Sequence, residues 1–324
     1  MKMVKVGLGE VILAPMAGIT GFPFRKTALK YGADFCFTEM ISALGFLHND
    51  KRTLELTEAG NDKERTGIQL FGSTPDILAR AAEKAVDKGF KIVDINMGCP
   101  VKKVVKTGAG SAILKDINVF YLIVEAVRRA IKDSIFTIKI RSGFDESSVN
   151  FVEIAKIAES SGVNAIFFHP RARSLMFSGV ADHSLTKVLK NTVNIPVYAS
   201  GDVFSVADAV RIKQYTGVDG IIFARGAIGK PWIFTEYINT VKLGGITQPI
   251  NNKQKIDIMI ELTEAVSSFY GKERGCGIMK PHLYSFLKGF KGSKALRVMV
   301  NNARNEGEII NILKISIEEE LSGD

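Results

Sequence analysis

Residues 91–100 read Lys-Ile-Val-Asp-Ile-Asn-Met-Gly-Cys-Pro, an apolar run that leads directly into a glycine-proline turn. A strand is expected over Lys91–Ile95, because a short apolar run bounded by turn residues is typical of a buried strand. A structural cysteine would lie inside that strand, whereas Cys99 lies where the chain leaves the sheet. Loops at strand ends are where folds present reactive groups to ligands. The stretch therefore predicts a buried strand followed by a catalytic loop.

The same unit, a short strand followed by an amphipathic helix, repeats along the chain. The candidate strands are Val11–Ala14, Asp34–Thr38, Gly67–Phe71, Lys91–Ile95, Phe136–Ile140, Ala165–Phe168, Pro196–Ala199 and Gly220–Phe223. The candidate helices include Pro75–Lys88, Asn118–Lys132, Ser148–Ser161 and Ser205–Tyr215. Eight such units in about 230 residues predict an α/β fold, the (β/α)8 TIM barrel. The alternative, an open doubly wound sheet, has fewer strands and a glycine-rich turn after the first, where this chain has Ala14-Pro15-Met16.

Polar and turn residues gather at the carboxyl ends of these strands, the face where such barrels do their chemistry. They are Pro15, Met16, Glu39, Gln69, Asn96, Cys99, Lys139, Arg141, His169, Arg171, Arg173, Ser200, Gly201, Asp202, Arg225 and Gly226. The sequence therefore predicts a single site to which all eight strands contribute.

Three of these side chains also have a purely structural explanation. Lys139 alternates with apolar residues, so it points inward and needs an anion, either a ligand or an ion-pair partner. Gln69 suits the polar edge of a heteroaromatic ring, and equally a core position satisfied by backbone. His169 suits an ordinary core histidine. We favour a ligand contact for Lys139, leave Gln69 open, and favour the core explanation for His169 taken alone.

Two successive loops, Ala199–Val203 and Ala224–Lys230, combine glycines with a helix start downstream, and the second also supplies Arg225. Barrels hold phosphate groups with this arrangement. Two tight turns without a ligand are the alternative. Because both loops carry the pattern, we favour phosphate binding.

Composition excludes several classes of protein. The 324 residues are 46% hydrophobic and 24% charged, as in an ordinary globular chain. Cys36, Cys99 and Cys276 form no Cys-x-x-Cys pair, so we expect neither disulfides nor a metal site. Met1–Glu10 does not resemble a signal peptide, and no uncharged run approaches the roughly 18 residues of a membrane span. We expect a soluble, cytoplasmic protein with no membrane contact.

Basic charge is concentrated near the C-terminus. The net charge is +9, and residues 271–304 hold eight Lys and Arg against one Glu, a local charge of +7. Tyr270, Tyr284, Phe286 and Phe290 lie in or beside this block, which therefore suits a polyanion with phosphates to neutralise and bases to stack. The alternative is a solvated helix face, the commoner meaning of a charge run taken alone.

The pattern beyond the polar break at Gln248–Lys253 is helical. Apolar stripes at helical spacing are formed by Ile256, Met259, Ile260, Thr263 and Val266, and by Leu283, Phe286, Leu287 and Phe290. We therefore expect a catalytic barrel over residues 1–245 and a small all-helical domain over 250–324.

Together these motifs resemble the tRNA-dihydrouridine synthase family, flavin mononucleotide (FMN) enzymes that reduce specific uridines in transfer RNA. The matching segments follow the family's order from Ala14 to Phe234, and Asn96-Met97-Gly98-Cys99-Pro100 is the most specific of them. The others are Ala14–Gly18, Gly67–Gly72, Lys103-Val104, Lys139–Arg141, His169–Arg171, Gly201–Val203 and Arg225–Trp232.

The resemblance implies a role for each site residue. Cys99 would be the proton donor. From the chemistry of the uracil ring, we expect Asn96 to orient the uracil by its polar edge, and Arg171 or Arg173 to bind the neighbouring phosphate or carbonyl. FMN would be bound by Pro15, Met16, Ala17, Gln69, Lys139, His169, Ser200, Gly201, Asp202, Ala224 and Arg225, the last five at the ribityl phosphate. The chain departs from the common pattern at Ser200, where many relatives have asparagine, and at Pro170 and Ala224, where glycine is common.

The chemistry agrees with these residue types. Reducing the C5–C6 bond of uracil adds hydride at C6 and a proton at C5, so the site needs a flavin and one acid. A thiol with a pKa near its ordinary value of about 8.5 stays protonated at neutral pH and suits that role. The resemblance further implies NADPH or NADH as reductant, and tRNA as partner through the C-terminal helices; we expect a monomer.

A loop beyond Cys99 would continue the cationic path toward the site through Lys102, Lys103 and Lys106. Its glycines, Gly108 and Gly110, predict closure over an extruded base. Three other classes stay open on the residues alone. They are a flavin enzyme of the dihydropyrimidine or dihydroorotate type, a flavin-free barrel with a Schiff-base lysine at Lys139, and a pure RNA-binding module.

Overall fold

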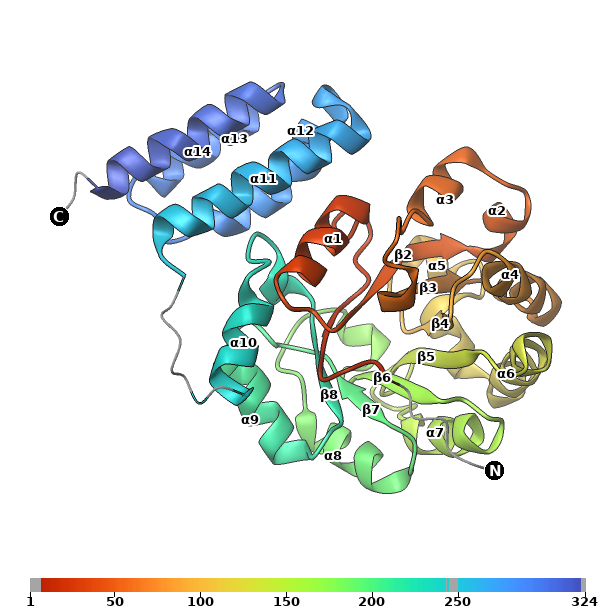
Figure 1. The fold of residues 1–324 in the computed structure, drawn as a ribbon. Helices are drawn as coiled ribbons and strands as arrows, with labels where there is room; N and C mark the ends of the chain where they lie inside the picture. The colour runs from red at the N-terminus through yellow and green to blue at the C-terminus, as the bar shows by residue number, and fades with distance from the viewer. Residues whose placement is uncertain (1–6, 243, 245–249, 322–324) are drawn as a thin grey trace.

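A closed barrel of parallel strands forms the centre of the protein (Figure 1). The computed structural model describes residues 7–242, 244 and 250–321. The strands are β1 (Val11–Leu13), β2 (Phe35–Ser42), β3 (Thr66–Phe71), β4 (Ile92–Met97), β5 (Ile135–Arg141), β6 (Ala165–His169), β7 (Val197–Ala199) and β8 (Gly220–Phe223). Each strand pairs with the next along the chain, and β8 closes onto β1. The predicted strands and the (β/α)8 fold are confirmed, with β2 running further than expected.

Large rings fill the interior of the barrel. Phe35 contacts Phe37, Phe37 contacts Phe167, and Phe167 contacts Tyr198, with centroid distances of 5.2, 5.0 and 5.1 Å. Gly67 makes room for one of these rings, since a Cβ there would lie 2.6 Å from Phe37. Aromatic rings bury much apolar area and pack well edge to face. The interior is therefore a solid core, and the chemistry is left to the loops at the carboxyl ends of the strands.

Helices cover the outside of the barrel (Figure 1). They are α1 (Phe22–Lys30), α4 (Pro75–Asp87), α6 (Ile117–Ile131), α7 (Phe151–Ser160), α8 (His183–Thr192), α9 (Val206–Thr216) and α10 (Ile233–Lys242). Helix α4 buries Leu78, Ala81, Ala82 and Ala85, which lie at helical spacing on one face of the helix. Three shorter helices, α2 (Ala43–Leu47), α3 (Lys51–Leu56) and α5 (Lys102–Val105), are too short to leave a periodic pattern in the sequence.

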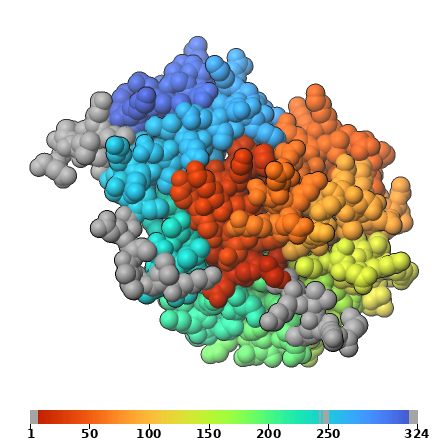
Figure 2. All heavy atoms as spheres, viewed as in Figure 1, coloured from red at the N-terminus to blue at the C-terminus, as the bar shows by residue number. Residues whose placement is uncertain are grey.

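Four further helices, which we call the helical region, follow the barrel: α11 (Asn252–Tyr270), α12 (Lys272–Phe286), α13 (Ser293–Asn302) and α14 (Glu306–Leu321). Their expected helical character is confirmed. They lie against α1 and the chain after β8 (Figures 1 and 2), where Phe269 contacts Phe22 at 5.4 Å and Phe286 contacts Trp232 at 5.9 Å. The expected boundary between 245 and 250 lies in a segment outside the described residues. Among the described helices, none has the length and apolar character needed to cross a membrane.

Candidate active site

A cavity of about 300 Å³ opens at the carboxyl ends of the strands, in the size range of small-molecule sites. It is lined by Ala14, Pro15, Met16, Ala17, Met40, Asn96, Gly98, Cys99, Pro100, Val101, Lys139, Arg141, His169, Phe177, Ser200, Gly201, Asp202, Val203, Phe204, Ile222, Ala224 and Arg225. Most residues that the sequence predicts for the site therefore lie around one cavity. The exceptions are Glu39, Gln69, Arg171, Arg173 and Gly226, so β3 contributes no residue to the cavity wall.

The side chain of Asn96 fixes the Cys99 loop, the turn that follows β4, through hydrogen bonds to its backbone. The Asn96 amide oxygen accepts hydrogen bonds from the backbone N–H groups of Cys99 at 2.8 Å and Gly98 at 3.1 Å. Ser111 donates to the Cys99 carbonyl from both its backbone N–H and its hydroxyl. Burial raises the pKa of the Cys99 thiol, so the thiol stays protonated at neutral pH. The loop presents a neutral acid to the cavity.

A buried polar network lies beneath Asn96. Gln69 donates to Asp94 at 2.7 Å and accepts from Asn96 at 2.9 Å, and the Thr137 hydroxyl donates to the second Asp94 oxygen at 2.7 Å. Burial raises the pKa of Asp94 to about 6. Gln69, which the family resemblance assigned to the flavin edge, is thus buried in this network and is not part of the cavity wall. Asp94 is a member that sequence reasoning missed, although an acid inside an apolar strand is itself a signal.

Two cations of β5 face the cavity. Lys139 is partly buried, and burial, followed by repulsion from Arg141, lowers its pKa to about 8. Arg141 donates to the backbone carbonyls of Gly98 at 3.0 Å and Ala172 at 3.1 Å, and burial lowers its pKa to about 10. Neither side chain forms an ion pair within the described part of the chain. The cavity therefore offers positive charge without a protein anion bound to it.

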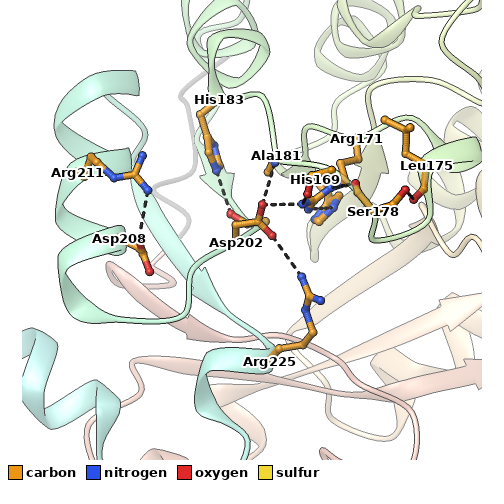
Figure 3. Close-up of polar contacts among 12 residues, drawn as sticks. His169, Arg171, Leu175, Ser178, Ala181, His183, Asp202, Asp208, Arg211 and Arg225 are labelled. Atoms are coloured by element: carbon orange, nitrogen blue, oxygen red, sulfur yellow. Dashed lines mark hydrogen bonds and ion pairs between the residues drawn. The ribbon is translucent and has the colours of Figure 1, made fainter.

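The buried Arg171 and the partly buried Asp202 form the centre of a second network (Figure 3). Arg171 donates to Asp202 at 2.6 Å and to the carbonyls of Ser178 and Gly179 at 3.1 and 2.8 Å. Arg225 donates to the other Asp202 oxygen at 3.2 Å. Burial alone would raise the pKa of Asp202, but the Arg171 hydrogen bond and the charges of both arginines lower it. Arg171, predicted to contact substrate, instead positions the loop that carries Asp202.

Arg173, also predicted to contact substrate, lies outside the cavity wall. Its guanidinium carbon lies 5.0 Å from the centre of the Phe144 ring.

His169 does line the cavity, and its pKa lies well below the ordinary value because of burial and the nearby charges of Lys139, Arg141 and Arg171. A neutral imidazole is the form present at physiological pH.

Backbone donors gather at the end of the cavity formed by β7 and β8. Gly201 and Asp202 both have positive φ, at 111° and 52°, and their N–H groups have no acceptor in the described part of the chain. A Cβ at Gly201 would lie 3.0 Å from Ala181 and 3.2 Å from His169. Successive free N–H groups beside an arginine suit an anion. The phosphate site expected at these loops stays a prediction.

Two exposed rings at the cavity mouth were missed by sequence reasoning. Phe177 and Phe204 both lie close to Arg225, whose guanidinium carbon is 5.2 and 4.9 Å from their ring centres. Their side chains are about half exposed, at 52% and 46%. An isolated phenylalanine in a loop carries no periodic signal, so the sequence offered no means of finding them.

The aromatic residues of the basic block are less accessible than the sequence suggested. Phe286 is buried, because it packs between Trp232 and Phe290. Tyr270 packs against Phe269 and is half-buried. The expectation that Phe286 is available to stack on a base is therefore wrong.

Comparison with known proteins extends these observations. The sequence profile of the family "Dihydrouridine synthase (Dus)" matches residues 12–322. The tRNA-dihydrouridine synthase B of Pasteurella multocida is 37% identical over 296 residues, 90% of this chain and 88% of that protein. The tRNA-dihydrouridine synthase B of Pseudomonas aeruginosa is 36% identical over 310 residues, 94% of this chain and 93% of that protein.

Two solved structures share the fold at low sequence identity. Histamine dehydrogenase from Rhizobium sp. 4-9 has a TM-score of 0.52 at 13% identity, over 81% of this chain and 50% of that one. A variant of NCR from Zymomonas mobilis has a TM-score of 0.53 at 17% identity, over 76% of this chain and 90% of that one. At this level of identity, these two similarities show a shared fold alone. The family profile and the two relatives, by contrast, extend along almost the entire sequence, and on that ground the chain belongs to the dihydrouridine synthase family.

Proposed function

We propose that this protein is a tRNA-dihydrouridine synthase that reduces the C5–C6 bond of uridines in tRNA, with FMN as cofactor and NADPH or NADH as reductant. The observation that carries the proposal is a single cavity in which a neutral thiol, Cys99, faces the unpaired cations Lys139 and Arg141. Membership of the family and the names of the two relatives support the same activity.

The residues around the cavity fit FMN. The free N–H groups of Gly201 and Asp202, with Arg225 beside them, would hold the ribityl phosphate together with Ser200, Ala224 and His169. Pro15, Met16 and Ala17 would contact the flavin through the backbone. Lys139 would neutralise negative charge on the flavin ring. When bound in its reduced form, FMN supplies the hydride that adds to C6 of the uracil.

Cys99 would supply the proton that completes the reaction. Addition of hydride at C6 leaves negative charge on C5 and the C4 carbonyl, and the thiol proton moves from Sγ of Cys99 to C5. The resulting thiolate recovers a proton from solvent. Asn96 and Arg141 hold the two sides of the Cys99 loop, at the Cys99 N–H and the Gly98 carbonyl, so that the thiol is positioned before substrate arrives.

The two parts of the chain would have different roles in this activity. The barrel (1–245) would carry catalysis and the helical domain (250–324) would bind tRNA. Lys102, Lys103 and Lys106 are exposed in the segment after Cys99, where they would add positive charge near the cavity. The amide of Asn96 is committed largely to the loop and to Gln69, so we assign it to positioning in preference to direct uridine contact. The protein would act as a monomer in the cytoplasm, without a metal.

Nucleoside analysis tests the proposal. Unmodified tRNA transcript is incubated with the protein, FMN and either NADPH or NADH, then digested and analysed for dihydrouridine by mass spectrometry. Free uridine and uracil serve as competing substrates, which separates an RNA reductase from a small-molecule flavin enzyme. Absence of dihydrouridine in the tRNA with both reductants would contradict the proposed function.

A further inference from the structure

His282 lies at the centre of the contact between the helical region and the barrel. It belongs to α12, and its side chain is fully buried. Its Nδ1 accepts a hydrogen bond from the backbone N–H of Gly229 at 3.3 Å. Its ring packs against Phe24 of α1 with a centroid distance of 4.4 Å. A polar ring in this position joins three elements that are far apart in the sequence.

Gly229 lies in the same loop as two residues that line the cavity. Gly229 belongs to the chain after β8, residues 224–232, which we call the β8 loop; Ala224 and Arg225 of the same loop line the cavity. The β8 loop is packed tightly on α12, since a Cβ at Gly229 would lie 2.2 Å from the His282 carbonyl oxygen. Gly229 also has a φ of 67°, which disfavours any other residue there.

The His282 ring also lies near a second part of the cavity wall. The backbone of Ile19 is close to the ring, and Nε2 has no hydrogen-bond partner in the described part of the chain. Ile19 belongs to the β1 loop, residues 14–21, in which Pro15, Met16 and Ala17 line the cavity. Strands β1 and β8 are neighbours in the barrel. His282 therefore lies behind the junction of two adjacent cavity walls.

The hydrogen bond defines the state of the ring. Because Nδ1 accepts from Gly229, a neutral ring carries its proton on Nε2. Burial lowers the pKa of His282 to about 4, so the ring stays neutral and the acceptor is present throughout the physiological pH range.

We propose that His282 is a positioning residue for the cavity: by accepting the Gly229 N–H, it fixes the β8 loop and so couples the docking of the helical region to cofactor binding. That the cofactor is FMN rests on the proposed function. A side chain outside the cavity would thus contribute to FMN affinity through the loop that carries Ala224 and Arg225.

Two substitutions separate positioning from simple packing. His282→Phe keeps a ring against Phe24 but removes the acceptor, and so leaves the Gly229 N–H without a partner. His282→Asn keeps an acceptor near the position of Nδ1 but loses most of the ring contact. Packing alone predicts that the asparagine variant is the poorer in both stability and FMN affinity. A positioning role predicts the opposite order for FMN affinity: His282→Phe binds FMN more weakly than His282→Asn, although it is the more stable of the two.

The test uses the full-length chain with FMN as the probe. The Kd is measured by quenching of flavin fluorescence, and the unfolding midpoint by circular dichroism. We expect the Kd of His282→Phe to rise about fivefold, the factor that corresponds to one net hydrogen bond, and that of His282→Asn to rise clearly less despite its lower midpoint. Cys276→Ala is the matched control, because Cys276 is buried in the same helix and its Sγ contacts the Ala303 carbonyl of the helical region.

Each outcome bears on the inference. A positioning role for His282 is overturned if FMN affinity ranks in the same order as the unfolding midpoints, or if it is the same in all variants. This holds whatever the dihydrouridine assay gives. If the wild-type chain binds FMN but forms no dihydrouridine, only the proposed RNA substrate is contradicted. The effect of His282 on FMN affinity can still be measured. A wild-type chain that binds no FMN overturns both.

Discussion

The amide oxygen of Asn96 accepts a hydrogen bond from the backbone N–H of Cys99 at 2.8 Å. The same oxygen accepts from Gly98 at 3.1 Å, while the amide nitrogen donates to Gln69 at 2.9 Å. Asn96 thus joins the loop that carries the thiol to the buried network of Gln69 and Asp94. A loop fixed in this way needs little reorganisation when substrate binds.

Replacing Asn96 by alanine is expected to loosen the Cys99 loop. Two buried N–H groups would lose their acceptor, at a cost of about 1–3 kcal/mol in the free energy of unfolding. We expect dihydrouridine formation to fall at least about tenfold as the thiol loses its position. Asn118→Ala, an exposed position on α6, is the control. Equal rates for both variants would contradict a positioning role for Asn96.

Replacing Cys99 by alanine is expected to abolish turnover but to leave FMN bound. The thiol would be the acid that protonates C5, and loss of a general acid reduces rates by about 10²–10⁴-fold. FMN content is measured by absorbance of the purified variant and turnover by dihydrouridine formation under saturating reductant. Cys36→Ala, a buried cysteine outside the cavity, should retain turnover. Normal steady-state product formation by Cys99→Ala would rule out the acid role.

The periodicity of the apolar residues and the polar residues at the ends of the strands predicted most of this architecture from sequence alone. Strand β4 and its Cys99 loop were predicted because an apolar run ending in Gly-Cys-Pro specifies both burial and a turn. The depth of a side chain inside the barrel was not predictable: Gln69 points inward as expected, but it lies in the Asp94 network below the cavity. Direction along a strand follows from a period of two, whereas depth depends on how neighbouring strands are staggered.

Loop side chains were the least predictable part of the site. Arg171 and Arg173 follow β6 closely, yet the loop directs Arg171 into a buried pair with Asp202 and Arg173 onto Phe144. Phe286 has helical spacing, but which face of α12 meets the barrel depends on docking through Trp232. These outcomes rest on tertiary contacts that no local pattern encodes.

Replacing Asp94 by asparagine is expected to destabilise the barrel core. Asp94 accepts from both Gln69 and Thr137, and an asparagine would direct an N–H₂ group at one of these donors. The resulting unpaired donors would lower the free energy of unfolding by about 1–3 kcal/mol, measured by denaturant unfolding. Asp87→Asn, at the exposed end of α4, should change it little. Equal stability of the two variants would show that the network tolerates the exchange.

The charge of Lys139 gives a pH prediction. Its folded-state pKa is lowered to about 8, so the positive charge is present below that pH and is lost above it. We expect the Kd for FMN to rise as the pH increases through 8, measured by flavin fluorescence. Between 8 and the ordinary value of 10.5, the unfolded chain binds more protons, so the stability of the free protein rises with pH in that window. Lys139→Met should remove both effects, and an unchanged pH profile in that variant would contradict the assignment.

The basic block of the helical region gives the final prediction, on RNA binding. Lys288 and Lys294 are exposed, whereas Arg274 is paired with Glu55 and Lys280 donates to the Asn301 carbonyl. If the two exposed lysines contact tRNA phosphates, each alanine substitution should weaken binding at low salt and reduce the slope of log K against log salt by about 1. Lys156→Ala, exposed on α7, should leave the slope unchanged. Slopes equal to wild type for both lysine variants would instead assign this surface to solvation, the alternative that a charge run allows.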